Sequence, residues 1–115
     1  MYIFSYSEVL SDGPATARAA ESEVIERSIE LMEAAERAGM SSRESIEAVY
    51  FVNRVWCHFI EDLGRPDNDL PQDLRAKLIS IGIFLIKTAD EIRSGTATSF
   101  RGMIEISRAI AMGLK

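Results

Sequence analysis

Apolar residues recur at helical spacing along most of the chain. Residues three and four positions apart form apolar rows, which is the spacing of one face of an α-helix. Gly and Pro residues separate these stretches and mark where each helix begins or ends. The pattern predicts four helices at about residues 14–38, 42–63, 71–94 and 99–113.

The second segment is the most apolar and organises the others. Between residues 48 and 60 only three polar side chains interrupt it: Asn53, Arg54 and His58. A β-strand is the alternative, because Val, Tyr, Phe and Ile favour strands. More than twenty residues without a breaker are too many for a strand, and Ser41 with Glu44 has the capping-box spacing of a helix start. We therefore predict a central helix at 42–63.

Local signals also position the other helices. Pro14 and Pro71 are suited to the first position of a helix, where the missing N–H costs nothing. Thr98 or Ser99 is the expected N-cap of the last helix. Gly82 lies inside the third helix, where it costs about 1 kcal/mol relative to Ala. Its presence there predicts the close approach of a neighbouring helix.

The amino-terminal residues 1–12 follow a different pattern. Tyr2, Phe4 and Tyr6 alternate with smaller or aliphatic residues, as in an extended segment. A lone strand has no partner in a helical chain, so we predict an arm that lays its rings on the helices. The predicted fold is all-α, a four-helix bundle with a short extended N-terminal arm, in a single domain over residues 1–115.

Composition fits a soluble globular protein. The chain has 115 residues, of which 47% are hydrophobic and 27% charged. The longest apolar run, residues 79–86, is far too short for a membrane span, and the start of the sequence lacks the features of a signal peptide. One cysteine cannot form an internal disulfide. We therefore expect a cytoplasmic protein with no membrane contact.

Charge is distributed unevenly. Residues 1–69 carry a net charge of −8 and residues 70–115 a net charge of +3, for −5 overall. Such polarity can steer an acidic partner to the second half, although it more often reflects a solvated surface. The absence of interleaved aromatics and a pI of 4.9 argue against a nucleic-acid module. The basic residues considered for RNA are Arg75, Lys77, Lys87, Arg93, Arg101 and Arg108.

The sequence gives little support for a catalytic site or a metal site. His58 is the single histidine and lies in the most apolar helix, so we interpret it as a partly buried structural residue. A di-iron bundle needs two histidines and four inward carboxylates, and a zinc site needs further His or Cys ligands. Cys57 has apolar neighbours and is expected in the core. With no phosphate-binding glycine motif, we predict no enzyme activity, cofactor, metal or small-molecule substrate.

Several segments together resemble the flagellar biosynthesis regulator FlaF family. They cover nearly the whole chain in order: Tyr2, Ser5-Tyr6, Glu8-Val9-Leu10, residues 48–51 through Glu61-Asp62-Leu63, 70–82, 92–95, 100–106 and Gly113-Leu114. Ser107 departs from the Asn expected in many members. The resemblance implies a flagellin-binding export chaperone and positive regulator of flagellin synthesis, without enzymatic activity. The alternative is a post-transcriptional regulator or adaptor that acts through FlbT or flagellin mRNA without binding flagellin.

The apolar stripes on the second and third helices are wider than one packing seam. Either they form a fully enclosed core, or part of them is a groove for another helix. With flagellin as the implied partner, we place this groove between the second and third helices, with the aromatic arm as a lid. The candidate lining residues, each of which fits the core equally well, are Tyr2, Phe4, Tyr6, Phe51, Phe59 and Phe84.

Overall fold

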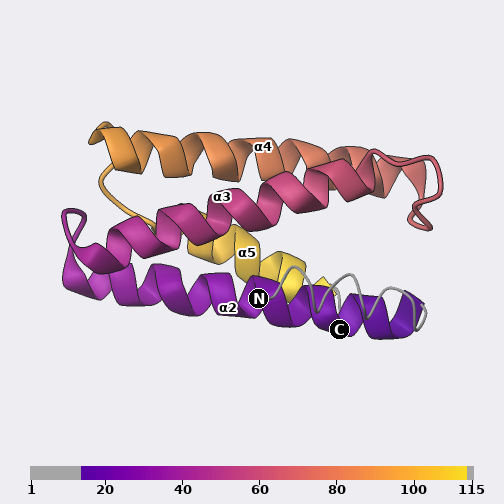
Figure 1. Ribbon diagram of the computed structural model, residues 1–115, viewed down its shortest axis with the longest axis horizontal. Helices are drawn as coiled ribbons and strands as arrows, with labels where there is room; N and C mark the ends of the chain where they lie inside the picture. Colours follow the sequence, from indigo (N-terminus) through magenta and orange to yellow (C-terminus); the bar gives the residue numbers. More distant parts are fainter. Residues whose placement is uncertain (1–13, 114–115) are drawn as a thin grey trace.

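The computed structural model describes residues 14–113, with their side chains from residue 20 onward. Four α-helices make up most of this part of the chain (Figure 1): α2 (Pro14–Ala38), α3 (Arg43–Leu63), α4 (Gln72–Ser94) and α5 (Arg101–Gly113). The predicted all-α class and the four helices are confirmed. The predicted arm, with Tyr2, Phe4 and Tyr6, lies outside the described residues.

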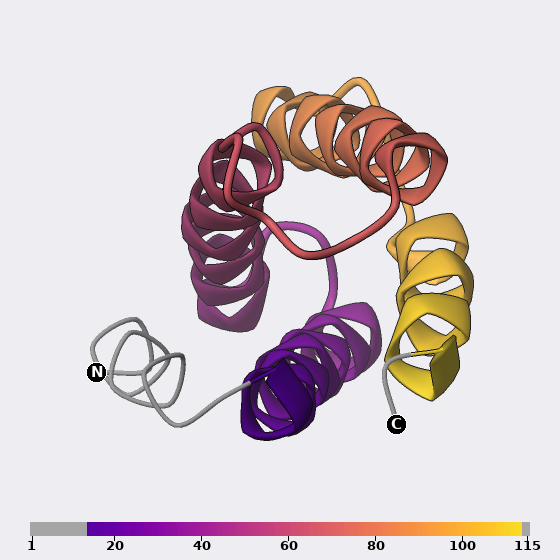
Figure 2. The same ribbon diagram turned by 90° about the vertical axis from the view of Figure 1, so that its right-hand side faces the viewer.

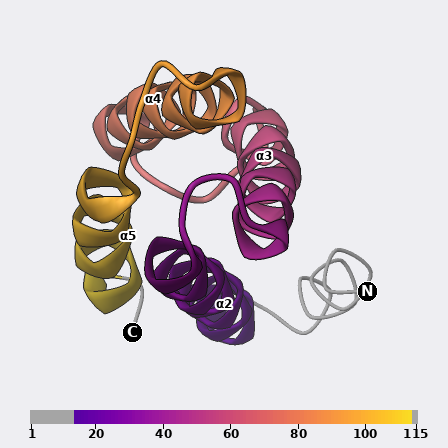
Figure 3. The same cartoon turned by 90° about the vertical axis from the view of Figure 1, so that its left-hand side faces the viewer.

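The four helices surround one shared core, as the two end views show (Figures 2 and 3). α3 packs against α2 on one side and α4 on the other, and α2 also packs against α5. The other pairs among these helices approach each other much less closely. The largest fully buried side chains come from all four sides of the ring: Ile25, Met32, Trp56, Leu85, Phe100 and Met103. α2 and α3 therefore each pack against two helices, and the prediction that the other helices pack around α3 is wrong for α5, which packs on α2.

α3 and α4 are in close contact at Gly82. A Cβ atom at this position would lie 2.6 Å from Cε3 of Trp56 and 3.1 Å from the side chain of Ile60. Real Cβ atoms essentially never come so close to another heavy atom, so only glycine fits here without a shift of the Trp56 ring or of the helices. The close approach predicted from Gly82 is thus confirmed. Away from it, the N-terminal half of α3 and the C-terminal half of α4 diverge (Figure 1).

The helix ends match the sequence signals to within a residue or two. Ser42, and not Ser41, is the N-cap of α3, since its hydroxyl accepts a hydrogen bond from the N–H of Ser45 at 3.1 Å. The capping box predicted from Ser41 and Glu44 is therefore wrong, because the cap lies one residue later and the residue three positions after it is Ser45. Pro71 is the N-cap of α4 and not its first helical residue, because its extended ψ of 146° precedes the helical turn.

The start of α5 is capped from another helix. The carboxylate of Glu36, near the end of α2, accepts hydrogen bonds from the Phe100 N–H at 2.8 Å and from the Ser99 hydroxyl at 2.9 Å. The Ser99 hydroxyl oxygen in turn accepts one from the Arg101 N–H at 3.0 Å. A carboxylate at a helix N-terminus also interacts favourably with the helix dipole. Together with the Arg108–Glu33 ion pair, these bonds fix α5 on α2.

Candidate functional site

Few large apolar side chains remain exposed on the described surface: Ile46 (70%), Tyr50 (61%), Leu74 (41%), Ile83 (56%), Phe84 (48%) and Met112 (75%). Single exposed apolar residues are normal on soluble proteins. Ile46 and Tyr50 differ from the others because they are one turn apart on α3 and line the same depression. A paired, concave arrangement of this kind is typical of a docking surface and not of scattered exposure.

The depression lies where α3 and α4 diverge, and we call it the splayed groove. Its volume is about 330 Å³, within the range of sites that hold a ligand or the side chains of a partner. α3 and the turn before it supply Met40, Ser45, Ile46, Val49, Tyr50, Asn53 and Arg54, and α4 supplies Asp90, Ile92 and Arg93. Gly82 lets the two helices pack closely at one point, and the halves that line the groove diverge from each other (Figure 1).

The splayed groove has an apolar floor. Val49 and Ile92 are only 8% and 4% exposed, so they belong to the core and present their edges to the depression. Ile46 and Tyr50 stand higher on the α3 side and are open to solvent. An occupant that covered these two side chains would remove apolar surface from water, which stabilises a complex by about 25 cal/mol per Å² before the costs of association.

Charged residues form the rim of the splayed groove. Nη1 of Arg54 donates a hydrogen bond to the Tyr50 hydroxyl at 2.9 Å, and the guanidinium lies 5.5 Å from the centroid of the Tyr50 ring, close enough for a cation–π contact. Arg93 is paired with Asp90 in an exposed ion pair, which contributes little to stability. The rim therefore carries two guanidinium groups and one carboxylate.

The structure places the predicted partner-binding residues differently. Phe59 is buried and lies edge-on against Trp56, with ring centroids 5.4 Å apart. Phe51 is half-buried against the core, and Phe84 is exposed on α4. None of these three lines the splayed groove. The groove lies between the pair of helices expected from the sequence, but Ile46 and Tyr50 were not among the candidates.

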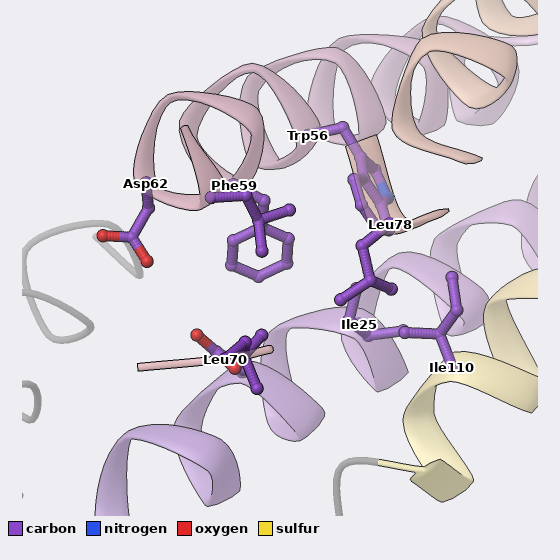
Figure 4. A pocket seen from close by; sticks show the side chains of 9 residues that line it. Ile25, Trp56, Phe59, Asp62, Leu70, Leu78 and Ile110 are labelled. Atoms are coloured by element: carbon purple, nitrogen blue, oxygen red, sulfur yellow. The ribbon is translucent and has the colours of Figure 1, made fainter. Parts of the chain in front are cut away.

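A second hollow lies inside the bundle, near the start of α2. Its lining comes from all four helices and the α3–α4 loop: Glu21, Ile25, Trp56, Phe59, Asp62, Leu63, Leu70, Leu78 and Ile110. Figure 4 shows Phe59 and Trp56 from α3 facing Ile25 and Ile110 across it. Its volume is about 30 Å³, room for a water molecule but not for a cofactor or substrate. It is a packing defect of the core and not a ligand site.

The residues considered for catalysis do not form a site. His58 is half-buried on α3, as predicted, with its ring 6.5 Å from that of Phe59. Cys57 is exposed, so its predicted place in the core is wrong. Its sulfur lies 3.4 Å from Oδ1 of Asn53. Within residues 14–113, no three His, Cys, Asp or Glu side chains come together as metal ligands.

Two further observations concern membranes and nucleic acids. None of the described helices is long and apolar enough to cross a bilayer. Three of the basic residues considered for RNA interact with groups of this chain. Arg75 donates to the carbonyls of Leu63 and Arg65, Arg93 pairs with Asp90 and Arg108 with Glu33. These cations therefore already have partners within the protein.

Comparison with known proteins gives one clear result. The family model described as "Flagellar protein FlaF" matches residues 2–114. A search of curated proteins and a search of solved structures each gave no match. Ser107, the departure noted above, is buried on α5. Because the match covers almost the whole chain, this protein belongs to the FlaF family of flagellar proteins, which is not a family of enzymes.

Proposed function

We propose that this protein is a cytoplasmic, flagellin-binding export chaperone that promotes flagellin synthesis. The observation that carries the proposal is the family match together with an apolar groove on the surface of a helical bundle. Flagellin assembles through amphipathic terminal helices, and such helices would associate prematurely if they remained uncovered in the cytoplasm. A helical bundle with an apolar groove protects such a helix by binding its apolar face.

The structure supports binding more than catalysis. The core is filled by this chain's own side chains, and the inner cavity is too small for a substrate. The open apolar surface instead lies on the outside, between α3 and α4. A surface of this kind acts by covering a partner and performs no bond chemistry. The protein is accordingly expected to act in stoichiometric amounts on flagellin.

Mixing the purified protein with flagellin monomers at tens of micromolar tests this proposal. We expect the two proteins to co-elute from a size-exclusion column and the amount of flagellin polymer formed to fall as the protein is added. A parallel run replaces flagellin with FlbT. Co-elution with FlbT alone, while folded flagellin elutes separately, would show that the protein is an adaptor and would contradict the chaperone role.

A further inference from the structure

We propose that the splayed groove binds an acidic amphipathic helix of flagellin, with the apolar face on Ile46 and Tyr50 and a carboxylate on Arg54. This inference rests on the proposed function and adds to it the binding surface and the chemistry of the bound segment. Three features of the groove carry it: the spacing of its exposed residues, the divergence of its two walls and the charge of its rim.

The spacing of the lining residues fits a helix. Ile46 and Tyr50 are four residues apart on α3, and so are Val49 and Asn53, so the four side chains form two neighbouring rows on one face of the helix beside the depression. A helix that lies along such a row places its own residues, at the same intervals, between them. An extended strand would need unpaired backbone groups to pair with, and these two α-helices offer none along the groove.

The divergence of α3 and α4 leaves room for an added helix. Where the two helices meet, Gly82 brings them too close for any side chain to enter. Toward residues 46 and 93 they separate, and the floor consists of the edges of Val49 and Ile92. A third helix can therefore pack against both α3 and α4 at this end, where the two helices do not cover each other.

The charge of the rim selects an acidic helix. The splayed groove carries two guanidinium groups and one carboxylate, although the protein as a whole carries a net charge of −5. The Tyr50 hydroxyl and ring hold Arg54 in place, and only one of its N–H groups makes a hydrogen bond among the described residues. A positioned guanidinium with open donors binds a carboxylate through two parallel hydrogen bonds. Elsewhere, the glutamates of α2 repel the same helix, which favours this surface.

The test compares groove variants with matched controls in titrations against full-length flagellin. Ile46→Ser and Arg54→Glu change the groove. Met112→Ser removes a side chain of similar exposure that lines a different surface depression, between α2 and α5, and Arg101→Glu makes the same charge change on α5. All four positions are exposed, so circular dichroism is expected to show folded proteins in each case. We expect each groove variant to raise the Kd about tenfold or more, and each control less than about twofold.

The salt dependence of the Kd distinguishes the proposed contact between Arg54 and a carboxylate from the apolar contact at Ile46. The wild-type Kd is expected to rise between 50 and 500 mM NaCl because exposed charge pairs are screened. In Arg54→Glu this dependence is expected to disappear or reverse, while in Ile46→Ser it is expected to persist. A Kd that is independent of both salt and Arg54 would overturn the acidic character of the bound helix.

The remaining outcomes distinguish the site from the function. If wild-type protein binds flagellin and the groove variants bind equally well, the proposed function stands and this site is wrong. If wild-type protein does not bind flagellin, both are wrong. If Ile46→Ser instead converts a wild-type dimer into a monomer, measured by light scattering, the groove is an interface between two copies of this chain and the inference is overturned.

Discussion

Trp56→Ala is expected to lower the free energy of unfolding by about 3–5 kcal/mol, as large aromatic deletions in cores do. The Trp56 ring is 2% exposed and lies between Phe59 on its own helix and Gly82 on α4. Because α4 packs closely only against α3 among the described helices, a cavity at this point also weakens the attachment of α4. A typical domain has 5–15 kcal/mol of stability in total, so the variant would be marginal.

Urea unfolding followed by circular dichroism measures this loss, since Trp56 is the single tryptophan and its fluorescence disappears with it. Ile83→Ala is the control. Ile83 is 56% exposed on α4, so its truncation is expected to change stability by less than about 0.5 kcal/mol. A loss below about 1 kcal/mol in Trp56→Ala would show that the α3–α4 contact is not the main attachment of α4.

Gly82→Ala is expected to destabilise the protein, although Ala is the better helix former. Helix propensity favours Ala by about 1 kcal/mol. The new methyl would, however, meet Cε3 of the buried Trp56 ring at 2.6 Å, and overpacking of a core costs about 1–3 kcal/mol. The ring cannot turn away freely because Phe59 packs against it. We therefore expect a net loss of about 1–2 kcal/mol, measured by the same urea unfolding.

A double-mutant cycle separates the two contributions. In the Trp56→Ala background the ring is gone, so Gly82→Ala should be neutral or should stabilise the protein by up to about 1 kcal/mol. The two substitutions would then show a coupling of about 2 kcal/mol, within the range of residues in contact. Additive effects would mean that α3 and α4 do not meet at this pair.

The helices could be predicted from sequence because their signals are local. Gly39 and Gly95 both adopt positive φ at helix ends, and Gly82 marks a point of close contact between α3 and α4. The cap at Glu36 could not be predicted, because its partner Phe100 is 64 positions away. The exposure of Cys57 could not be predicted either, because apolar neighbours in the sequence do not tell which side of a helix faces solvent.

The splayed groove was predicted only in outline. The sequence points to the second and third helices because their apolar stripes are wider than one seam, and a depression does lie between them. That this depression binds a partner stays a prediction. The sequence does not give the angle at which α3 and α4 cross. This angle decides which end of the apolar stripe on α3 is exposed to solvent. Ile46 belongs to the same apolar row as Trp56, yet Trp56 is 2% exposed and Ile46 70%. Aromatic content pointed to Phe51, Phe59 and Phe84, whereas the divergence of the helices exposes Ile46 and Tyr50.

Hydrogen exchange of this protein with and without saturating flagellin tests the central claim most directly. If flagellin binds in the splayed groove, backbone amides of residues 43–54 and 86–95 should exchange more slowly in the complex, because the added helix suppresses local opening there. The outward-facing part of α2 should be unchanged. Slower exchange confined to α2 and α5, or no change in any segment at saturating flagellin, would contradict this account.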